Sequence, residues 1–139
     1  SRVGPTLKQI QDTYGDKVRI VWRDMALPMH SRAGPAAEAA QCAHEQGKFW
    51  EYHDKIFANQ SALTDDDFKK YAGELSLNAE AFATCYGSGK FKADIQKDAS
   101  EGQQVGVTGT PAFFVNGRFV SGAQPFEAFK VLIDEELAR

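Results

Sequence analysis

The order of apolar and polar residues predicts a helix and then a strand at the start of the chain. Residues 2–14 carry apolar side chains at helical spacing, namely Val3, Leu7, Ile10 and Tyr14. Residues 17–22 alternate instead: Val18, Ile20 and Trp22 share one side, and charged Arg19 lies on the other. This period of two predicts a strand with one face toward the core.

Five helices are predicted between residues 31 and 104. Ser31, Thr64 and Asn78 are expected to be N-caps, because their side-chain oxygens can accept hydrogen bonds from the first backbone N–H groups of a helix. Three aspartates follow Thr64 directly, and negative charge is favourable at the positive end of the helix dipole. Gly47 is expected to end the first of these helices. The middle of the chain is therefore expected to be helical throughout.

The end of the chain predicts a β-hairpin followed by a helix. Ala112–Val115 is a short apolar run bounded by turn residues, and Arg118–Ser121 is the expected return strand. Asn116-Gly117 between them is a strong hairpin signal, because a type I′ turn needs positive φ at both central positions. Pro125 is expected to open the last helix.

Thr110-Pro111 directly precedes the first hairpin strand and is a candidate cis peptide. Only X-Pro bonds make the cis form accessible, at a cost of about 0.5–1 kcal/mol. A cis bond here would leave the backbone of Thr110 free to pair with an extended peptide. The alternative is a trans proline that merely starts a strand, a position where proline is common.

Size and composition favour one globular domain. The chain has 139 residues, of which 42% are apolar and 25% are charged, and both values are ordinary for a folded domain. The net charge of −3 without a basic stripe argues against a nucleic-acid partner. No apolar run approaches the ~18 residues of a membrane span, and residues 1–5 contain no signal-peptide core. Because the chain lacks an initiator methionine, we expect a processed product or part of a longer protein.

Together these motifs resemble a known family. The order G-T-P, strand, N-G, strand, helix resembles the C-terminal half of a thioredoxin fold, in which the cis-proline loop faces the redox site. The segments GVTGTPAFFVNGRFVSGAQP and QGKFWEYHDKIF are similar to the DsbA-like branch, the thiol–disulfide oxidoreductases, and the likeness covers essentially the whole chain. The resemblance implies a single α/β, thioredoxin-like domain with a helical insertion. Residues 1–30 and 105–139 would form the thioredoxin half, and residues 31–104 the insertion.

The C-x-x-C motif of this family is missing from the 139 residues. Thiol–disulfide exchange needs a thiolate of lowered pKa at a helix N-terminus and a second thiol one turn away. The resemblance implies that Ser1 follows directly after the second cysteine, and that the first strand of the sheet also lies upstream. We therefore expect upstream residues or another chain to supply the central strand beside residues 18–22. The alternative is a degenerate domain that never had the motif.

The resemblance assigns substrate positioning to the proline loop. Thr110 and Pro111 are expected to hold the substrate backbone, while Thr108 and Gly109 shape the loop. The implied function is thiol–disulfide exchange on unfolded or partly folded proteins, with a redox partner protein, no cofactor, and a periplasmic or otherwise extracytoplasmic location. The alternative function is a redox-inactive module that binds extended peptides at the same loop.

Cys42 and Cys85 are the only cysteines. An even count is compatible with one disulfide, and two buried free thiols are the alternative. The resemblance implies a structural disulfide, since some relatives carry a second pair away from the redox site. A catalytic role is not expected, because the two residues are far apart in sequence and neither lies at a clear helix N-terminus.

Histidine and aromatic residues near Cys42 allow two further hypotheses. His44 lies two residues from Cys42, so their side chains point to different faces of a helix and no metal site is expected. The helix that follows carries Phe49, Trp50, Tyr52 and Phe57. We expect these rings to pack in the core between the insertion and the thioredoxin half, and the alternative is a client-binding groove.

Overall fold

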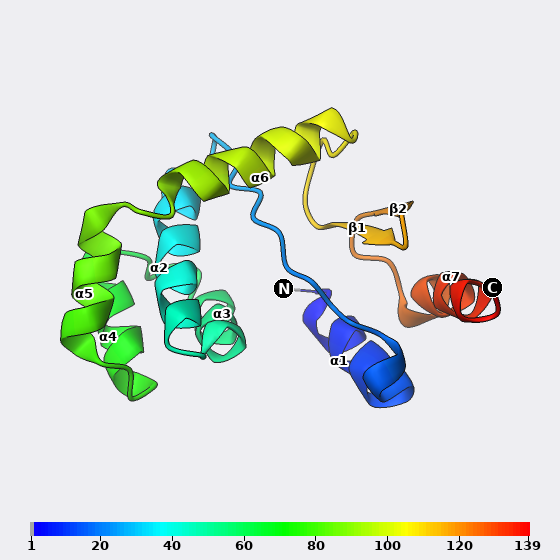
Figure 1. The fold of residues 1–139 in the computed structure, drawn as a ribbon, viewed down its shortest axis with the longest axis horizontal. Coiled ribbons are helices and arrows are strands. Elements are labelled where there is room, and N and C mark those ends of the chain that lie inside the picture. Colours follow the sequence, from blue (N-terminus) through cyan, green and yellow to red (C-terminus); the bar gives the residue numbers. More distant parts are fainter. Residues whose placement is uncertain (1) are drawn as a thin grey trace. The chain divides into compact units, whose positions relative to one another are not determined.

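The computed structural model describes residues 2–139, which divide into two compact units. Unit 1 comprises the described residues up to Arg23 together with Gln103–Arg139, and unit 2 comprises Asp24–Gly102. The elements (Figure 1) are α1 (Gly4–Tyr14), η1 (Gly15–Lys17), α2 (Ala33–Glu45), α3 (Phe49–Ala58), α4 (Asp65–Glu74), α5 (Ala79–Ser88), α6 (Lys92–Gln104), β1 (Ala112–Val115), β2 (Arg118–Ser121) and α7 (Phe126–Leu137). The order of helices and hairpin strands follows the sequence prediction closely.

Unit 1 packs α1 and α7 against one face of the β1–β2 hairpin. The strands are antiparallel, with Phe113 opposite Val120 and Phe114 opposite Phe119. Because side chains alternate along a strand, Phe113 and Val120 face the helices, whereas Phe114 and Phe119 face the other way and stay exposed. A cluster of buried residues in this unit consists of Ile10, Val120, Phe129 and Ile133. Within unit 1, the helices therefore pack against only one face of the hairpin.

The strand predicted at residues 18–22 is not formed. The backbone is extended at Val18, yet residues 18–22 have no regular secondary structure. The predicted alternation holds only in part: Val18 and Ile20 are partly buried and Val21 is exposed, but Trp22, predicted on the side of Val18 and Ile20, is exposed as well. A strand needs a neighbour for its N–H and C=O groups, and the sheet of the described residues contains only β1 and β2. The alternating pattern was therefore not enough to form a strand, because the described residues contain no strand that pairs with residues 18–22.

Unit 2 contains the helices α2, α3, α4 and α5 (Figure 1). Their side chains surround buried aromatic rings. Tyr52, Phe68 and Phe82 are almost completely buried. The hydroxyl of Tyr52 donates to the carbonyl oxygen of Phe68 at 2.8 Å, so the buried phenol keeps a hydrogen-bond partner. Burial raises the pKa of Tyr52, because the ionised form would lose its hydration. Tyr52 therefore lies in the core of unit 2 itself, while Trp50 on the same helix remains exposed, and the expected packing between the insertion and the thioredoxin half stays a prediction.

The connector that begins at Asp24 belongs to unit 2. Asp24 is buried, and its backbone N–H donates to the carboxylate of Asp98 at 3.0 Å. Gln41 donates its amide to the carboxylate of Asp24, also at 3.0 Å. These contacts tie the connector to α2 and α6, so the units divide between Arg23 and Asp24.

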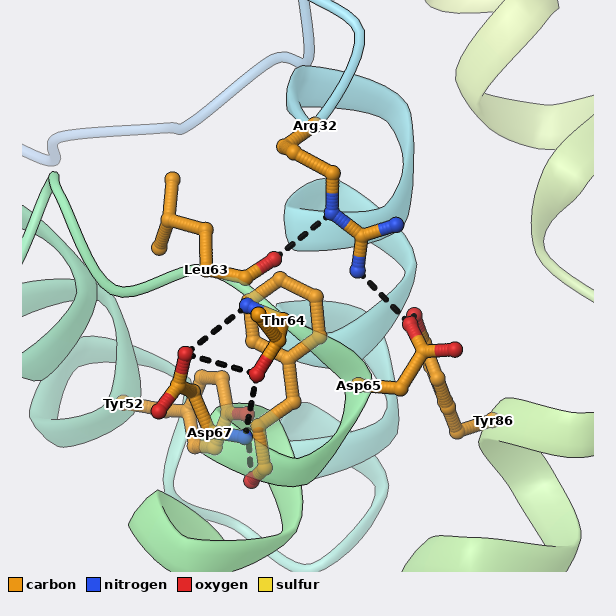
Figure 2. Close-up of polar contacts among 8 residues, drawn as sticks. Arg32, Tyr52, Leu63, Thr64, Asp65, Asp67 and Tyr86 are labelled. Carbon is orange, nitrogen blue, oxygen red and sulfur yellow. Dashed lines mark hydrogen bonds and ion pairs between the residues drawn. The ribbon is translucent and has the colours of Figure 1, made fainter.

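Two of the three predicted N-caps are confirmed. Thr64 forms a capping box with Asp67 (Figure 2): the Thr64 hydroxyl accepts from the backbone N–H of Asp67 at 3.1 Å, and the Asp67 carboxylate accepts from the backbone N–H of Thr64 at 2.9 Å. Asn78 caps α5 by accepting from the backbone N–H of Ala81. The prediction for Ser31 is wrong, because α2 begins later and has no side-chain cap.

Acid should destabilise unit 2 through Asp65 and Asp67. Hydrogen bonds from Tyr86 and then Arg32 lower the pKa of Asp65, and hydrogen bonds from Thr64 lower the pKa of Asp67. Since both pKa values are lower in the folded state, their contribution to stability is present above about pH 4 and is lost as the pH falls through the folded values. We expect the urea midpoint, followed by circular dichroism, to fall more steeply with acid in the wild type than in an Asp65→Asn/Asp67→Asn variant. If the urea midpoints of both proteins fell equally with acid, Asp65 and Asp67 would not be the cause of the acid destabilisation.

Candidate functional site

The proline loop, residues 106–111, connects α6 to β1 within unit 1. The Thr110–Pro111 peptide bond is cis. The carbonyl oxygen of Pro111 accepts a hydrogen bond from the N–H of Gly122 at 2.9 Å, which continues the hairpin pairing one step beyond Ala112 and Ser121. The C-terminal end of the loop is therefore anchored on the sheet.

The other end of the loop is anchored by a glycine turn and a buried side chain. Gly106 has a φ of +92°, a conformation that glycine adopts without a steric penalty. Its N–H donates to the carbonyl oxygen of Gln103 at 3.1 Å as α6 ends. Val107 is then buried. Because both ends of the loop are anchored, the backbone between the two ends has a defined position.

The four predicted substrate-binding residues form that stretch. Thr108, Gly109 and Thr110 are exposed, and Pro111 is partly buried. The structure gives the Thr110 backbone no hydrogen-bond partner within residues 2–139. This segment thus offers an unpaired N–H and C=O immediately before a strand, which is the arrangement needed to pair with an added extended segment.

An exposed aromatic pair on the hairpin was missed by the sequence analysis. Phe114 and Phe119 lie opposite each other with their ring centroids 5.2 Å apart. They are 45% and 48% exposed, on the hairpin face away from Phe113. The Asn116-Gly117 turn contained the signal, because a two-residue turn places the residues two before and two after it opposite each other. The pair adds apolar surface to the strands that follow the proline loop.

The two cysteines lie in unit 2 and form a disulfide. The sulfur atoms of Cys42 and Cys85 are 2.08 Å apart, and the bond joins α2 to α5 across 43 residues of sequence. The structural disulfide that the resemblance implied is therefore present. No free cysteine remains in residues 2–139, so these residues contain no thiol nucleophile. The expectation about Ser1 and a preceding C-x-x-C falls outside the described residues.

Residues 2–139 show neither a metal-binding cluster nor a membrane-spanning helix. No group of three or more His, Cys, Asp or Glu side chains in this range could hold a metal ion. None of the helices in the same range is long and apolar enough to cross a membrane. The candidate site of unit 1 consists of the backbone of the proline loop and the neighbouring aromatic pair.

Comparisons with known proteins agree with this arrangement. The Thioredoxin family model matches residues 2–135. A crystal structure of a thioredoxin-like oxidoreductase from Silicibacter pomeroyi superposes with a TM-score of 0.87 at 22% identity, over 99% of this chain and 79% of that one. The thioredoxin-like α/β fold predicted from the sequence is therefore confirmed.

The curated relatives are named as antiporters and not as oxidoreductases. An Na(+)/H(+) antiporter, NhaA 3, from Salinispora tropica is 37% identical over 93% of this chain, and one from Herminiimonas arsenicoxydans is 36% identical over 79% of it. The match takes in 20% and 17% of those proteins, so this chain spans about a fifth of their length. The family match covers nearly the whole chain, and the chain belongs to the thioredoxin family.

Proposed function

We propose that this chain is the scaffold and substrate-binding part of a thiol–disulfide oxidoreductase of the DsbA type, which acts on protein disulfides. The observation that carries the proposal is the exposed backbone of Thr110, held directly before β1 by an anchored loop. An extended substrate segment can pair with that backbone, and main-chain pairing tolerates many substrate sequences. Unfolded or partly folded proteins are therefore the proposed substrates.

The exchanging thiols are proposed to come from a C-x-x-C pair outside these residues. Cys42 and Cys85 are bonded to each other and buried, which is unlike the exposed, low-pKa thiolate that exchange requires. The sheet also supports an added segment: β1 pairs only with β2 among the described residues, and residues 18–22 are not part of that sheet. One segment that supplies both a strand and the thiol pair would satisfy both needs.

Insulin reduction tests this function. The full-length protein that contains these residues should accelerate the reduction of insulin disulfides by dithiothreitol, measured as turbidity of the released B chain. The 139-residue chain alone should give only the uncatalysed rate, because it contains no free thiol. Turnover by the chain alone would contradict the proposed origin of the thiols, and an inactive full-length protein would contradict the enzymatic function.

Peptide binding tests the role of the Thr110 backbone separately. A cysteine-containing extended peptide should bind the full-length protein, and N-methylation at the position that pairs with Thr110 should weaken binding by about tenfold, the loss expected for one or two backbone hydrogen bonds. The pairing position is found with a methylation scan, a set of peptides that are each N-methylated at one position. Their affinities are measured by fluorescence anisotropy. Methylation near the peptide ends is the control. Equal affinities across the scan would contradict strand-like pairing.

A second function is favoured by the names of the curated relatives. Since the matched relatives are antiporters of which this chain spans about a fifth, the alternative is a redox-inactive module that binds extended peptides within a longer transport protein. This alternative predicts that the full-length protein binds the peptide in the methylation scan but does not reduce insulin. The two assays together therefore separate the two functions.

An extracytoplasmic location, such as the periplasm, forms part of the proposal. Disulfides persist in oxidising compartments and are rare in the cytosol, and the Cys42–Cys85 bond supports such a setting. Protein precipitated with acid directly from cells should therefore contain no thiol that N-ethylmaleimide can label at these two positions.

A further inference from the structure

We propose that Cys85 is a thiol-exchange site, at which a small thiol without negative charge forms a mixed disulfide. This inference goes beyond the proposed function, because it involves neither the proline loop nor a C-x-x-C pair. It rests on an asymmetry between the two sulfurs of the disulfide and on the charges around the more accessible one.

The first observation is a cavity that reaches only one of the two cysteines. A hollow of about 620 Å³ in unit 2 is lined by Cys85, Thr84 and Ser88 of α5 and by charged side chains described below. Cys42 does not line it and is 2% exposed, whereas Cys85 is 7% exposed. Because access decides which sulfur of a disulfide is attacked, a thiolate that enters this cavity meets Cys85.

The second observation is the charge of the lining. Glu45, Glu80 and Lys90 border the cavity, and the ammonium group of Lys90 is paired with the Glu45 carboxylate. Two carboxylates against one ammonium leave a net negative lining. An anionic thiol is repelled from such a cavity, while a thiol that carries an ammonium group is not.

The reaction is an ordinary thiol–disulfide exchange. The thiolate sulfur of the small molecule bonds to Cys85 Sγ, the Cys42–Cys85 bond breaks, and its electron pair leaves on Cys42 Sγ, which takes up a proton. Cys42 lies in the apolar cluster with Ala39, Ala43 and Tyr52 and is 2% exposed, so the released sulfur is shielded from solvent. Because the thiolate is the attacking species in thiol–disulfide exchange, an acid quench traps the mixed disulfide on Cys85 before the bond to Cys42 forms again.

Peptide mapping of the full-length protein tests which sulfur reacts. Native protein is incubated with cysteamine, quenched in acid, treated with N-ethylmaleimide and digested with trypsin, which places Cys42 in peptide 33–48 and Cys85 in peptide 71–90. Cysteamine is expected on 71–90 and the maleimide on 33–48, in about fivefold or greater excess over the reverse. Equal labelling, an excess of cysteamine on 33–48, or adducts only after unfolding in urea would each overturn the proposal.

The charge preference is tested with two thiols and a matched pair of variants. Corrected for thiolate concentration, cysteamine should react faster than 3-mercaptopropionate, and Glu80→Gln should reduce that rate ratio by about threefold. Glu51→Gln is the control, since Glu51 is exposed on α3 and does not line the cavity. A ratio of one in the wild type, or equal ratios in both variants, would overturn the charge preference.

Discussion

Removal of the Cys42–Cys85 disulfide is expected to lower the free energy of unfolding of unit 2 by about 4 kcal/mol. The bond closes a loop across a sequence separation of 43 residues, and on the chain-entropy model a loop of that length restricts the unfolded state by about this amount. The variant is Cys42→Ala/Cys85→Ala, and the measurement is urea unfolding followed by the helical circular-dichroism signal. Alanine is preferred to serine, because a buried serine hydroxyl would lack a partner in the apolar cluster.

Reduction of the wild-type protein provides the control for this experiment. Reduced wild type and the double alanine variant should unfold at similar urea concentrations, since both lose the cross-link but the wild type keeps both side chains. If the free energy of unfolding fell by less than about 1 kcal/mol in both proteins, the disulfide would not stabilise unit 2 by restricting its unfolded state.

Phe68→Ala is expected to cost about 3–5 kcal/mol in the stability of unit 2, the range found for removing a buried phenylalanine side chain. Phe68 is 0% exposed. Its ring meets Tyr86 edge-on with centroids 5.7 Å apart, and the Arg32 guanidinium lies 5.4 Å above its centroid. The substitution therefore leaves a cavity and removes aromatic and cation–π contacts together. Urea unfolding by circular dichroism measures the loss.

Met29→Ala is the matched control for this substitution. Met29 also lies in unit 2 but is 75% exposed, so its truncation should change the stability by no more than about 0.5 kcal/mol. If the two variants unfolded at the same urea concentration, the bundle would not be organised around Phe68.

Much of the local structure could be predicted because its signals are local. The Asn116-Gly117 turn specifies a hairpin through the φ angles it allows, and both residues have positive φ in the structure. Thr64 and Asn78 begin helices because each cap is made within four residues of sequence. Ser31 has the same side-chain chemistry as Thr64, yet α2 begins two residues after it. A capping residue acts only where the chain geometry brings its oxygen to the first helical N–H groups.

The candidate site was predictable for a related reason. Thr108 to Pro111 are consecutive, so any fold brings them together, and their motif context indicated the family before the structure did. Phe114 and Phe119 were harder to assign as surface residues, because their exposure depends on which hairpin face the helices cover. That choice is made by Ile10, which lies far away in sequence, and by Phe129 and Ile133 on the helix that follows the hairpin.

By itself, the sequence determined the helix and hairpin order, the proline loop and the thioredoxin-like class, since each depends on short-range spacing or a contiguous motif. The tertiary structure decided three other matters. It joined Cys42 to Cys85 across two helices, and it left Cys85 beside a cavity that Cys42 does not reach. It also left residues 18–22 outside the sheet of the described residues despite their strand pattern. All three depend on contacts between residues distant in sequence, which spacing along the chain does not encode.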